Sequence, residues 1–256
     1  GAAEPGAEAL LALAERSGDS AIAQRAVELA LRARNLQLAI KASSLWLGLD
    51  PESQAGAYLA DMLGESRQLD TAEKQVNDLI TSANNKAPLL MHLNMLFARF
   101  AKKDEVRTVI DRIAGRYPDL AESSYAMGWA AFLANDFQAA GASADQALQR
   151  RPAWEKAAVL KLAAIRKRSA ADAFVFAESF LKTNPAAEDL RQNYARDLAG
   201  ERRYKEARRE FEMLARQRPQ DASIAFSNAL LAQQLNDLTE AEAEYNRALM
   251  LNYRDE

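Results

Sequence analysis

The sequence contains no cysteine, and this absence removes disulfides, thiolate nucleophiles and cysteine metal ligands together. A chain without cysteine suits an oxidising compartment as well as a reducing one, so the absence does not decide where the protein works. Histidine is nearly as scarce, because His92 is the only one and it lies between Met91 and Leu93 in an expected helix. We interpret His92 as a surface or packing residue.

The common patterns of catalytic and cofactor sites are missing as well. The sequence has no Gly-rich phosphate loop, no His-Glu-x-x-His metal spacing and no Ser–His–acid set that His92 could complete. Carboxylates are frequent, but they stand beside arginine or lysine, as Glu206 and Glu210 do around Arg209, which is typical of solvated helix faces. We therefore predict that the protein is not an enzyme and needs no cofactor or metal.

Charge and hydropathy argue against two further classes. The net charge of −3 is modest, so charge gives no reason to expect a nucleic-acid partner, which would favour a clustered basic surface. No apolar run reaches the 18 residues that a membrane-spanning helix needs. Because Gly1 is not followed by a charged and then an apolar segment, we expect any signal peptide to be absent from this sequence.

The sequence does contain a repeat of about 34 residues, marked by proline. Pro118, Pro152, Pro185 and Pro219 follow one another at separations of 34, 33 and 34 residues, and Pro51 lies two periods before Pro118. Proline cannot donate the next helical hydrogen bond and biases the residue before it away from the helix. The prolines therefore predict regular breaks between pairs of helices.

Small and aromatic residues keep the same period. Gly128, Ala195 and Ala229 stand where the first helix of a pair must approach a neighbour closely, and Phe211 and Tyr245 repeat an aromatic in the second helix. An alanine opens the second helix of most pairs: Ala39, Ala72, Ala140, Ala173, Ala207 and Ala241. We expect Ala140, Ala207 and Ala241 at close helix–helix contacts.

This combination of period, small residues, aromatic residues and proline resembles the tetratricopeptide repeat family over nearly the whole chain. The resemblance implies an all-α protein, a right-handed α-solenoid of about seven helical hairpins in a single array over residues 1–256. After a partial helix in 1–17, the expected repeats are 18–50, 51–84, 85–117, 118–151, 152–184, 185–218 and 219–252. The sequence lacks the family's first-helix tryptophan, and Asn85 replaces a proline. Asn94 and Lys161 stand at positions for small residues, so their units are expected to pack less regularly.

The same period predicts where helices begin and end. The last helix, near 239–251, has no sequence after it to cover its outer face, so we expect a partner, a longer parent chain or a packing contact there. The expected helices are Ala7–Arg16, Ser20–Arg34, Leu36–Leu49, Glu52–Glu65, Leu69–Ser82, Pro88–Ala101, Asp104–Tyr117, Leu120–Ala134, Phe137–Arg150, Trp154–Arg168, Ala171–Lys182, a pair in 185–219 that breaks at 200–203, Ala222–Leu235 and Thr239–Leu251.

One expected helix carries a second apolar face. At 100° per residue, Tyr125, Trp129 and Phe132 share one side, whereas Met127 and Ala131 turn away toward the second helix of the pair. In tetratricopeptide arrays the first helices line the concave surface, so the resemblance implies a groove. Its predicted residues are Met91, Met95, Arg99, Tyr125, Trp129, Phe132, Leu162, Ile165, Arg166, Arg196, Phe226 and Leu230.

Two interpretations of this face stay open. Methionine and aromatic residues suit adaptable recognition of apolar peptide segments. An aromatic stripe at helical spacing also suits packing between neighbouring repeats. A clamp for chaperone tails would need Lys and Asn at successive turns of the first groove helix, but Gln24 and Glu28 stand there, which argues against that class.

Four runs of residues carry a closer resemblance, namely 18–30, 45–51, 116–119 and 190–198. They are similar to bacterial outer-membrane tetratricopeptide lipoproteins. In the best known branch, the lipoprotein is a periplasmic adaptor that brings cell-wall hydrolases to a carboxyl-terminal processing protease. This resemblance implies a periplasmic protein whose parent is anchored in the outer membrane, although the lipidated cysteine and its signal are not in this sequence.

The sequence thus predicts a non-enzymatic scaffold or adaptor that binds protein or peptide partners through a concave groove. Its implied partners are a carboxyl-terminal processing protease and cell-wall hydrolases. One alternative is a scaffold in exopolysaccharide or cell-envelope assembly, which should show a groove rich in exposed acids and aromatics. Another is a cytoplasmic tetratricopeptide regulator, which a lipoprotein signal in the parent gene would exclude.

Overall fold

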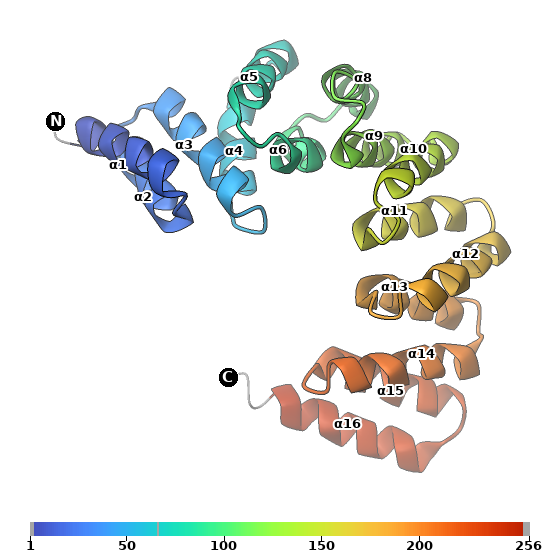
Figure 1. Ribbon diagram of the computed structural model, residues 1–256. Coiled ribbons are helices and arrows are strands. Elements are labelled where there is room, and N and C mark those ends of the chain that lie inside the picture. Colours follow the sequence, from blue (N-terminus) through green and yellow to red (C-terminus); the bar gives the residue numbers. More distant parts are fainter. Residues whose placement is uncertain (1–2, 66, 253–256) are drawn as a thin grey trace. The chain divides into compact units, whose positions relative to one another are not determined.

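The computed structural model describes residues 3–65 and 67–252 (Figure 1). Regular structure in these residues is helical throughout, with sixteen helices and no strand. The all-α prediction is therefore confirmed. The chain divides into two compact units, residues 1–152 and residues 153–256. The boundary falls at the predicted junction between the repeats 118–151 and 152–184, and a single continuous array stays a prediction.

The first unit contains ten helices among its described residues, most of them paired in hairpins, and the short helices α6 and α7 follow one another directly. Their bounds are α1 Ala3–Ser17, α2 Ser20–Arg32, α3 Leu36–Leu49, α4 Ala55–Gly64, α5 Leu69–Ser82, α6 Ala87–Met91, α7 Leu93–Leu96, α8 Lys103–Ala114, α9 Ala121–Leu133 and α10 Phe137–Arg150.

The second unit contains six helices in its described part, again arranged as hairpins (Figure 1). The bounds are α11 Glu155–Arg166, α12 Ala170–Thr183, α13 Glu188–Gly200, α14 Tyr204–Gln217, α15 Ala222–Gln234 and α16 Leu238–Asn252. In both units the breaks fall where the prolines predicted them, and most helix ends lie within three residues of the expected positions.

The backbone itself repeats with the period of the sequence. Among the residues that the structure describes, five other than glycine have a left-handed conformation with φ between 53° and 63°: Arg34, Arg67, Asn135, Arg202 and Asn236. Each ends the turn between the first and second helix of a hairpin, and their spacing fits a period of 33 to 34 residues. Left-handed backbone at non-glycine residues is uncommon, so its recurrence shows that these hairpin turns share one conformation.

The residue after this turn position caps the second helix in three of the five hairpins. The Asn35 side chain accepts a hydrogen bond from the Leu38 amide at 3.0 Å, and Asp136 accepts one from the Ala139 amide at 3.0 Å. Ser169 and Asp237 cap α12 and α16 in the same way. Such caps satisfy backbone N–H groups that have no partner within the helix, so α3, α10, α12 and α16 each begin at a capped residue.

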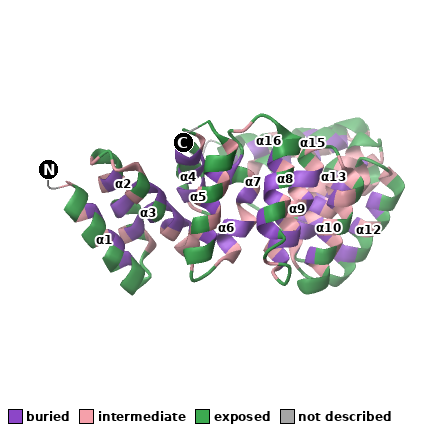
Figure 2. Cartoon of the chain, turned by 90° about the horizontal axis from the view of Figure 1, so that it is seen from above, coloured by how far each residue is buried: buried purple, intermediate pink, exposed green. Residues whose placement is uncertain are grey.

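The core is built largely from alanine. Buried residues form stripes along the helices (Figure 2), and the residues that open the second helices are all buried. Ala140 and Ala207 are fully inaccessible and Ala241 nearly so, which confirms that these positions lie at close contacts. The apolar residues of the helix pair in 185–219 are buried as well: Leu190, Tyr194, Ala195, Leu198, Ala207, Phe211 and Leu214.

One predicted helix is wrong. A continuous helix was expected over Pro88–Ala101, but the structure has two short helices, α6 and α7, interrupted at His92 and followed by a turn. The Nδ2 of Asn94 donates to the Ala126 carbonyl of α9 at 2.9 Å, and the Nδ1 of His92 lies 2.8 Å from the Pro88 carbonyl. A polar residue at the small-residue position thus bonds to the neighbouring helix, and the helix does not continue.

Candidate functional site

The aromatic face predicted on α9 is present as a row of touching rings. Tyr125 and Trp129 meet edge to face with ring centroids 6.4 Å apart, and Trp129 and Phe132 do so at 5.4 Å. The row continues to Phe137, the first residue of α10, whose ring lies 5.3 Å from Phe132. We call Tyr125, Trp129, Phe132 and Phe137 the aromatic row. Edge-to-face pairs of this kind are favourable.

The residues of α9 fall on two faces that differ in their burial. Ala126, Gly128, Ala130 and Ala131 are buried, whereas the three aromatic residues are half-buried. Met127, predicted to turn toward the second helix, packs against the buried core of the first unit. The aromatic row is therefore neither a closed core nor a fully exposed surface, and both earlier interpretations of it stay open.

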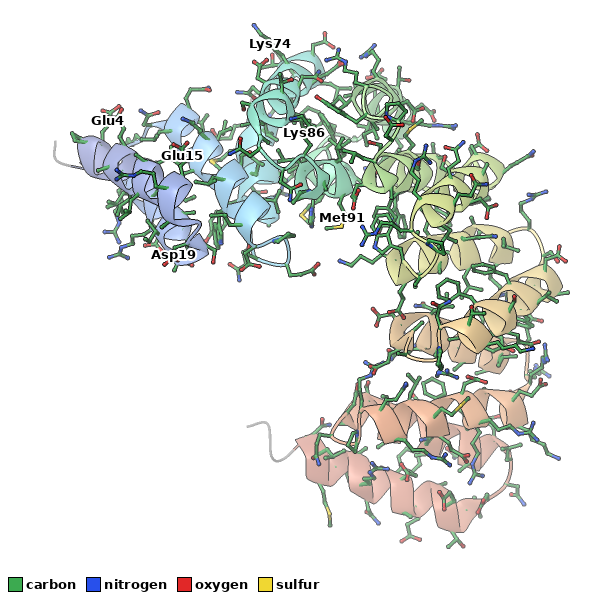
Figure 3. The ribbon with its side chains drawn as sticks, viewed as in Figure 1. Glu4, Glu15, Asp19, Lys74, Lys86 and Met91 are labelled. Carbon is green, nitrogen blue, oxygen red and sulfur yellow. The ribbon has the colours of Figure 1, made fainter. Side chains whose placement is uncertain are left out.

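The predicted residues before α9 lie on the broken helices. Met91 projects from α6 (Figure 3) and is half-buried, and Met95 on α7 is exposed. Arg99 follows in the turn after α7 and forms an ion pair with Asp61 of α4, with its Nε 2.7 Å from the carboxylate. The Asn94 bond to α9 ties this segment to the helix that carries the aromatic row.

Two glycines of α4 make room for these side chains. A Cβ at Gly56 would lie 2.7 Å from the sulfur of Met95, and a Cβ at Gly64 would lie 2.9 Å from both Cβ and Cγ of Arg99. Larger residues in α4 would push Met95 and Arg99 away from it. Glycine therefore sets the close approach of this segment to α4.

In the second unit one predicted groove residue is not available. Leu162 is only 1% exposed. The helix α11 is buried on most sides, since Ala158, Leu160 and Ala164 are fully buried too, and the Lys161 ammonium lies over the Phe176 ring. A surface role for Leu162 is thus wrong, whereas its neighbour Ile165 is half-buried.

The two predicted arginines of the second unit differ in their partners. Arg166 on α11 forms ion pairs with Asp197 of α13 at 3.7 Å and with Glu201, the residue that follows α13, at 2.6 Å. Burial raises the pKa of Asp197, and the positive charge of Arg166 opposes that rise. Arg196 is exposed and forms no hydrogen bond or ion pair with the described residues. Arg166 therefore acts first as a link between helices, and Arg196 is accessible.

Phe226 and Leu230 lie one turn apart on α15 and are both exposed. The Phe226 ring meets Tyr245 of α16 at 5.7 Å. They repeat the positions of Met91 and Met95 four periods later. Tyr58 on α4 occupies the equivalent position one period before Met91 and is also exposed. Tyr58 and Phe137 were missed from the sequence. Tyr58 could have been found by subtracting one period from Met91. Phe137 could not, because only the hairpin turn brings the start of α10 beside Phe132.

The structure brings the predicted residues together only within each unit. Met91, Met95, Arg99 and the aromatic row belong to the first unit, and Ile165, Arg166, Arg196, Phe226 and Leu230 to the second. A single groove through all of them stays a prediction. Among residues 3–65 and 67–252, no three acidic, histidine or cysteine side chains are grouped to hold a metal, and none of the helices has the length and hydropathy of a membrane span.

Comparisons with solved structures support the repeat fold. The chain is similar to MamA of strain RS-1, crystallised as an ArsTM double mutant, with 17% identity over 68% of this chain and 98% of that one and a TM-score of 0.52. MamA residues 41–end from Desulfovibrio magneticus RS-1 match with 17% identity, 67% and 97% coverage and a TM-score of 0.52. A human IFIT1 dimer with PPP-AAAA gives 14% identity, 98% and 68% coverage and a TM-score of 0.46.

The sequence matches no protein-family model and no curated protein. At 17% identity the similarity to the MamA structures supports the fold alone. These neighbours are tetratricopeptide-type helical repeat proteins. The fold of this chain is therefore that of a tetratricopeptide-type α-solenoid protein, as the period of the sequence predicted.

Proposed function

We propose that this protein is a non-enzymatic scaffold that binds a protein or peptide partner through the first helices of its hairpins. One observation carries the proposal. Four large apolar side chains on first helices stay 42 to 50% exposed at two recurring repeat positions, Tyr58 and Phe226 at one and Met95 and Leu230 at the other. Exposed apolar residues at random positions need no explanation, but a recurring set is typical of an interaction surface.

The aromatic row is the proposed centre of binding in the first unit. Its half-buried rings lie next to the segment that carries Met95, so an apolar peptide can bury both at once. Aromatic residues at the centre of an interface often contribute most of its binding energy, because a ring buries a large area at little cost in side-chain entropy. Arg99 and Asp61 add a polar edge to this surface.

A finer proposal follows the closer resemblance of the sequence. We propose a carboxyl-terminal processing protease of the bacterial periplasm, together with its cell-wall hydrolase substrates, as the partners of this surface. The support for this choice is the similarity of the runs 18–30, 45–51, 116–119 and 190–198 to outer-membrane lipoprotein adaptors. A location in the periplasm is part of the same proposal.

The test replaces Trp129 with Ala. We expect the Trp129→Ala protein to keep its helix content by circular dichroism and to bind the purified protease about thirtyfold more weakly, a loss of roughly 2 kcal/mol. Leu133→Ala is the matched control, because Leu133 lies on the same helix and is exposed outside the aromatic row. It should bind as the wild type does.

The same three proteins should then be used to recover partners from an envelope extract. Equal recovery by Trp129→Ala and Leu133→Ala would exclude the aromatic row as the binding surface. Loss of helix content in Trp129→Ala would show instead that the row is part of the core. If the purified protease does not bind the wild type, the protease is rejected as the partner. The scaffold proposal is then tested by the extract experiment.

A further inference from the structure

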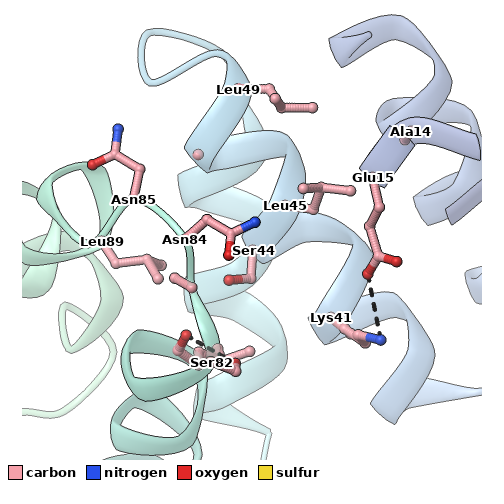
Figure 4. Close-up of a pocket in the computed structure, with 13 residues that line it drawn as sticks. Ala14, Glu15, Lys41, Ser44, Leu45, Leu49, Ser82, Asn84, Asn85 and Leu89 are labelled. Atoms are coloured by element: carbon pink, nitrogen blue, oxygen red, sulfur yellow. Dashed lines mark hydrogen bonds and ion pairs between the residues drawn. The ribbon is translucent and has the colours of Figure 1, made fainter. Parts of the chain in front are cut away.

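The first unit has a cavity of about 350 Å³ that lies away from the aromatic row. It is enclosed by the end of α1, the face of α3, the end of α5 with the segment after it, and the start of α6 (Figure 4). None of its lining residues was predicted as a site. Pockets of this size are at the lower end of those that bind small ligands.

Four leucines from three helices form the apolar part of the cavity: Leu45, Leu49, Leu79 and Leu89. Leu89 is fully buried, and the other three are half-buried. Leucine side chains that converge on a space of this volume favour an aliphatic group, because each apolar carbon removed from water adds to the binding free energy.

Ser44 gives the cavity an unsatisfied polar group. Its residue is only 9% exposed, and its hydroxyl forms no hydrogen bond with the described residues. A helical serine usually donates to the carbonyl four residues before it, but Ser44 does not. Figure 4 shows its oxygen inside the cavity beside Asn84. The hydroxyl faces the open cavity, so a ligand that enters the cavity can form a hydrogen bond with it.

Asn84 supplies the second polar group, and its repeat equivalent shows how unusual it is. Asn184 precedes Pro185, and its Nδ2 donates to the Phe180 carbonyl at 3.1 Å, which ends α12. Asn84 precedes Asn85 instead of a proline and forms no hydrogen bond with the described residues. Its carboxamide, which can donate and accept at once, is therefore available at the cavity.

The charges at the cavity cancel. Lys41 and Glu15 form an ion pair at 3.5 Å along one edge, and both side chains are largely exposed (Figure 4). The other lining groups, Ser82, Ala83 and Asn85 included, carry no charge. The site therefore has no net charge to attract an ionic ligand.

We propose that this cavity binds an extended, uncharged peptide segment through one aliphatic side chain. The side chain enters among the four leucines, while the Asn84 carboxamide and the Ser44 hydroxyl bond to the adjoining peptide group. A carboxamide matches the donor and acceptor of a peptide group, and one aliphatic residue with its flanking amides fits the volume. The site does not depend on the aromatic row and would give the protein a second, independent peptide contact.

Gly48 provides a variant that blocks the cavity without harming the fold. It lines the cavity, and a Cβ built there would meet no atom within 4 Å. A leucine at this position therefore occupies the cavity instead of the core. Gly200 on α13 is the matched control, because a Cβ there also meets nothing within 4 Å and the residue lies in the second unit.

The experiment titrates methyl-labelled protein with N-acetyl-leucine N-methylamide and follows the methyl signals of Leu45, Leu49, Leu79 and Leu89 by NMR. We expect saturable shifts with the leucine probe and at least tenfold weaker binding of the alanine analogue. The aspartate analogue should also bind at least tenfold more weakly. Gly48→Leu should abolish the shifts, and Gly200→Leu should retain them.

Asn84→Ala should weaken the leucine probe about fivefold, since one hydrogen bond is lost. Trp129→Ala should leave probe binding unchanged, which separates this site from the aromatic row. The proposal is overturned if the four leucines show no saturable shifts, if Gly48→Leu responds as the wild type does, or if the aspartate and leucine probes bind equally well.

Discussion

The hairpin α13–α14 and the stretch from α4 to α7 follow the same sequence period but differ in structure. The first consists of two unbroken helices of 13 and 14 residues. The second contains a helix of 10 residues and the two short helices α6 and α7, of 5 and 4 residues. The small-residue position holds a fully buried alanine, Ala195, in α13 and the polar Asn94 in α7.

The two segments differ in the residue at the small-residue position and in how that residue is accommodated. Ala195 lets α13 pack closely and needs no partner. Asn94 must satisfy a carboxamide, and it does so only in part, since its Oδ1 is buried without a hydrogen bond. Buried polar groups that lack a partner destabilise a fold. The helix is interrupted near Asn94, whereas α11 stays unbroken although Lys161 stands at the equivalent position, so a polar residue there accompanies a break in only one of these two hairpins.

The largest expected effect breaks the regular hairpin. Arg191 of α13 is buried, and its Nη1 lies 2.6 Å from Glu210 of α14, while its Nη2 donates to the Pro185 carbonyl at 3.0 Å. Arg191→Ala leaves Glu210 without its partner, so we expect a loss of about 3 kcal/mol in the free energy of unfolding by urea denaturation.

The control for this experiment is Arg25→Ala, which removes the exposed pair between Arg25 and Glu28 of α2. Exposed pairs contribute about 0 to 1 kcal/mol. If Arg191→Ala costs no more than Arg25→Ala, the buried pair does not hold α13 and α14 together.

Two glycine substitutions in the first unit should change the stability by smaller amounts and in opposite directions. Gly64→Ala places a methyl group 2.9 Å from Arg99, whose Cβ and Cγ cannot easily move, so we expect a loss of roughly 1–3 kcal/mol. Gly48→Ala meets open space in the last turn of α3 and should gain up to about 1 kcal/mol, because alanine favours the helix more than glycine does. Thermal unfolding of both variants checks the signs. If both variants are more stable than the wild type, the turn after α7 does not pack closely against α4.

The smallest effect concerns pH and the Asp136 cap of α10, whose repeat equivalents are the Asn35 cap of α3 and the Asp237 cap of α16. Hydrogen bonds from the Ala139 amide, and then from Arg107, lower the pKa of Asp136 below its usual value of 3.8. Because the folded protein favours the carboxylate, the stabilisation is fully present above pH 3.8 and is lost as the pH falls through the lowered pKa.

We therefore expect the melting temperature of the wild type to exceed that of Asp136→Asn by a constant margin above about pH 5, where the carboxylate is fully ionised in both states. The margin should shrink below pH 3.8. A margin that stays the same down to pH 2 would contradict the role of the charge and leave only the cap geometry, which asparagine can also supply.

The sequence allowed the fold to be predicted wherever one residue type decides the structure. Prolines such as Pro185 and alanines such as Ala207 can do little else at their positions, so they revealed the period, the breaks and the close contacts. The interruption at His92 could not be predicted, because Pro88–Ala101 contains good helix formers and the contacts of this segment, such as the bond from Asn94 to α9, come from helices elsewhere in the chain.

The candidate site was less accessible to sequence reasoning. Helical phase placed Tyr125, Trp129 and Phe132 together, which the structure confirms as a row of touching rings. It could not show that Leu162 is buried, since this depends on how α11 packs on all sides. The cavity beside Ser44 was invisible for the same reason, because its walls come from helices far apart in the chain.

The shared turn conformation at Arg202 and Asn236 has a consequence for how such a chain can grow or shrink. Each left-handed residue is followed at once by the first helix-capping position, so residues 203–236 form a cassette with matching ends. Its excision would join Arg202 to Asp237 and place α16 after α13, with Ala241 and Tyr245 in the positions of Ala207 and Phe211. The number of hairpins can therefore change by one period without any new type of junction.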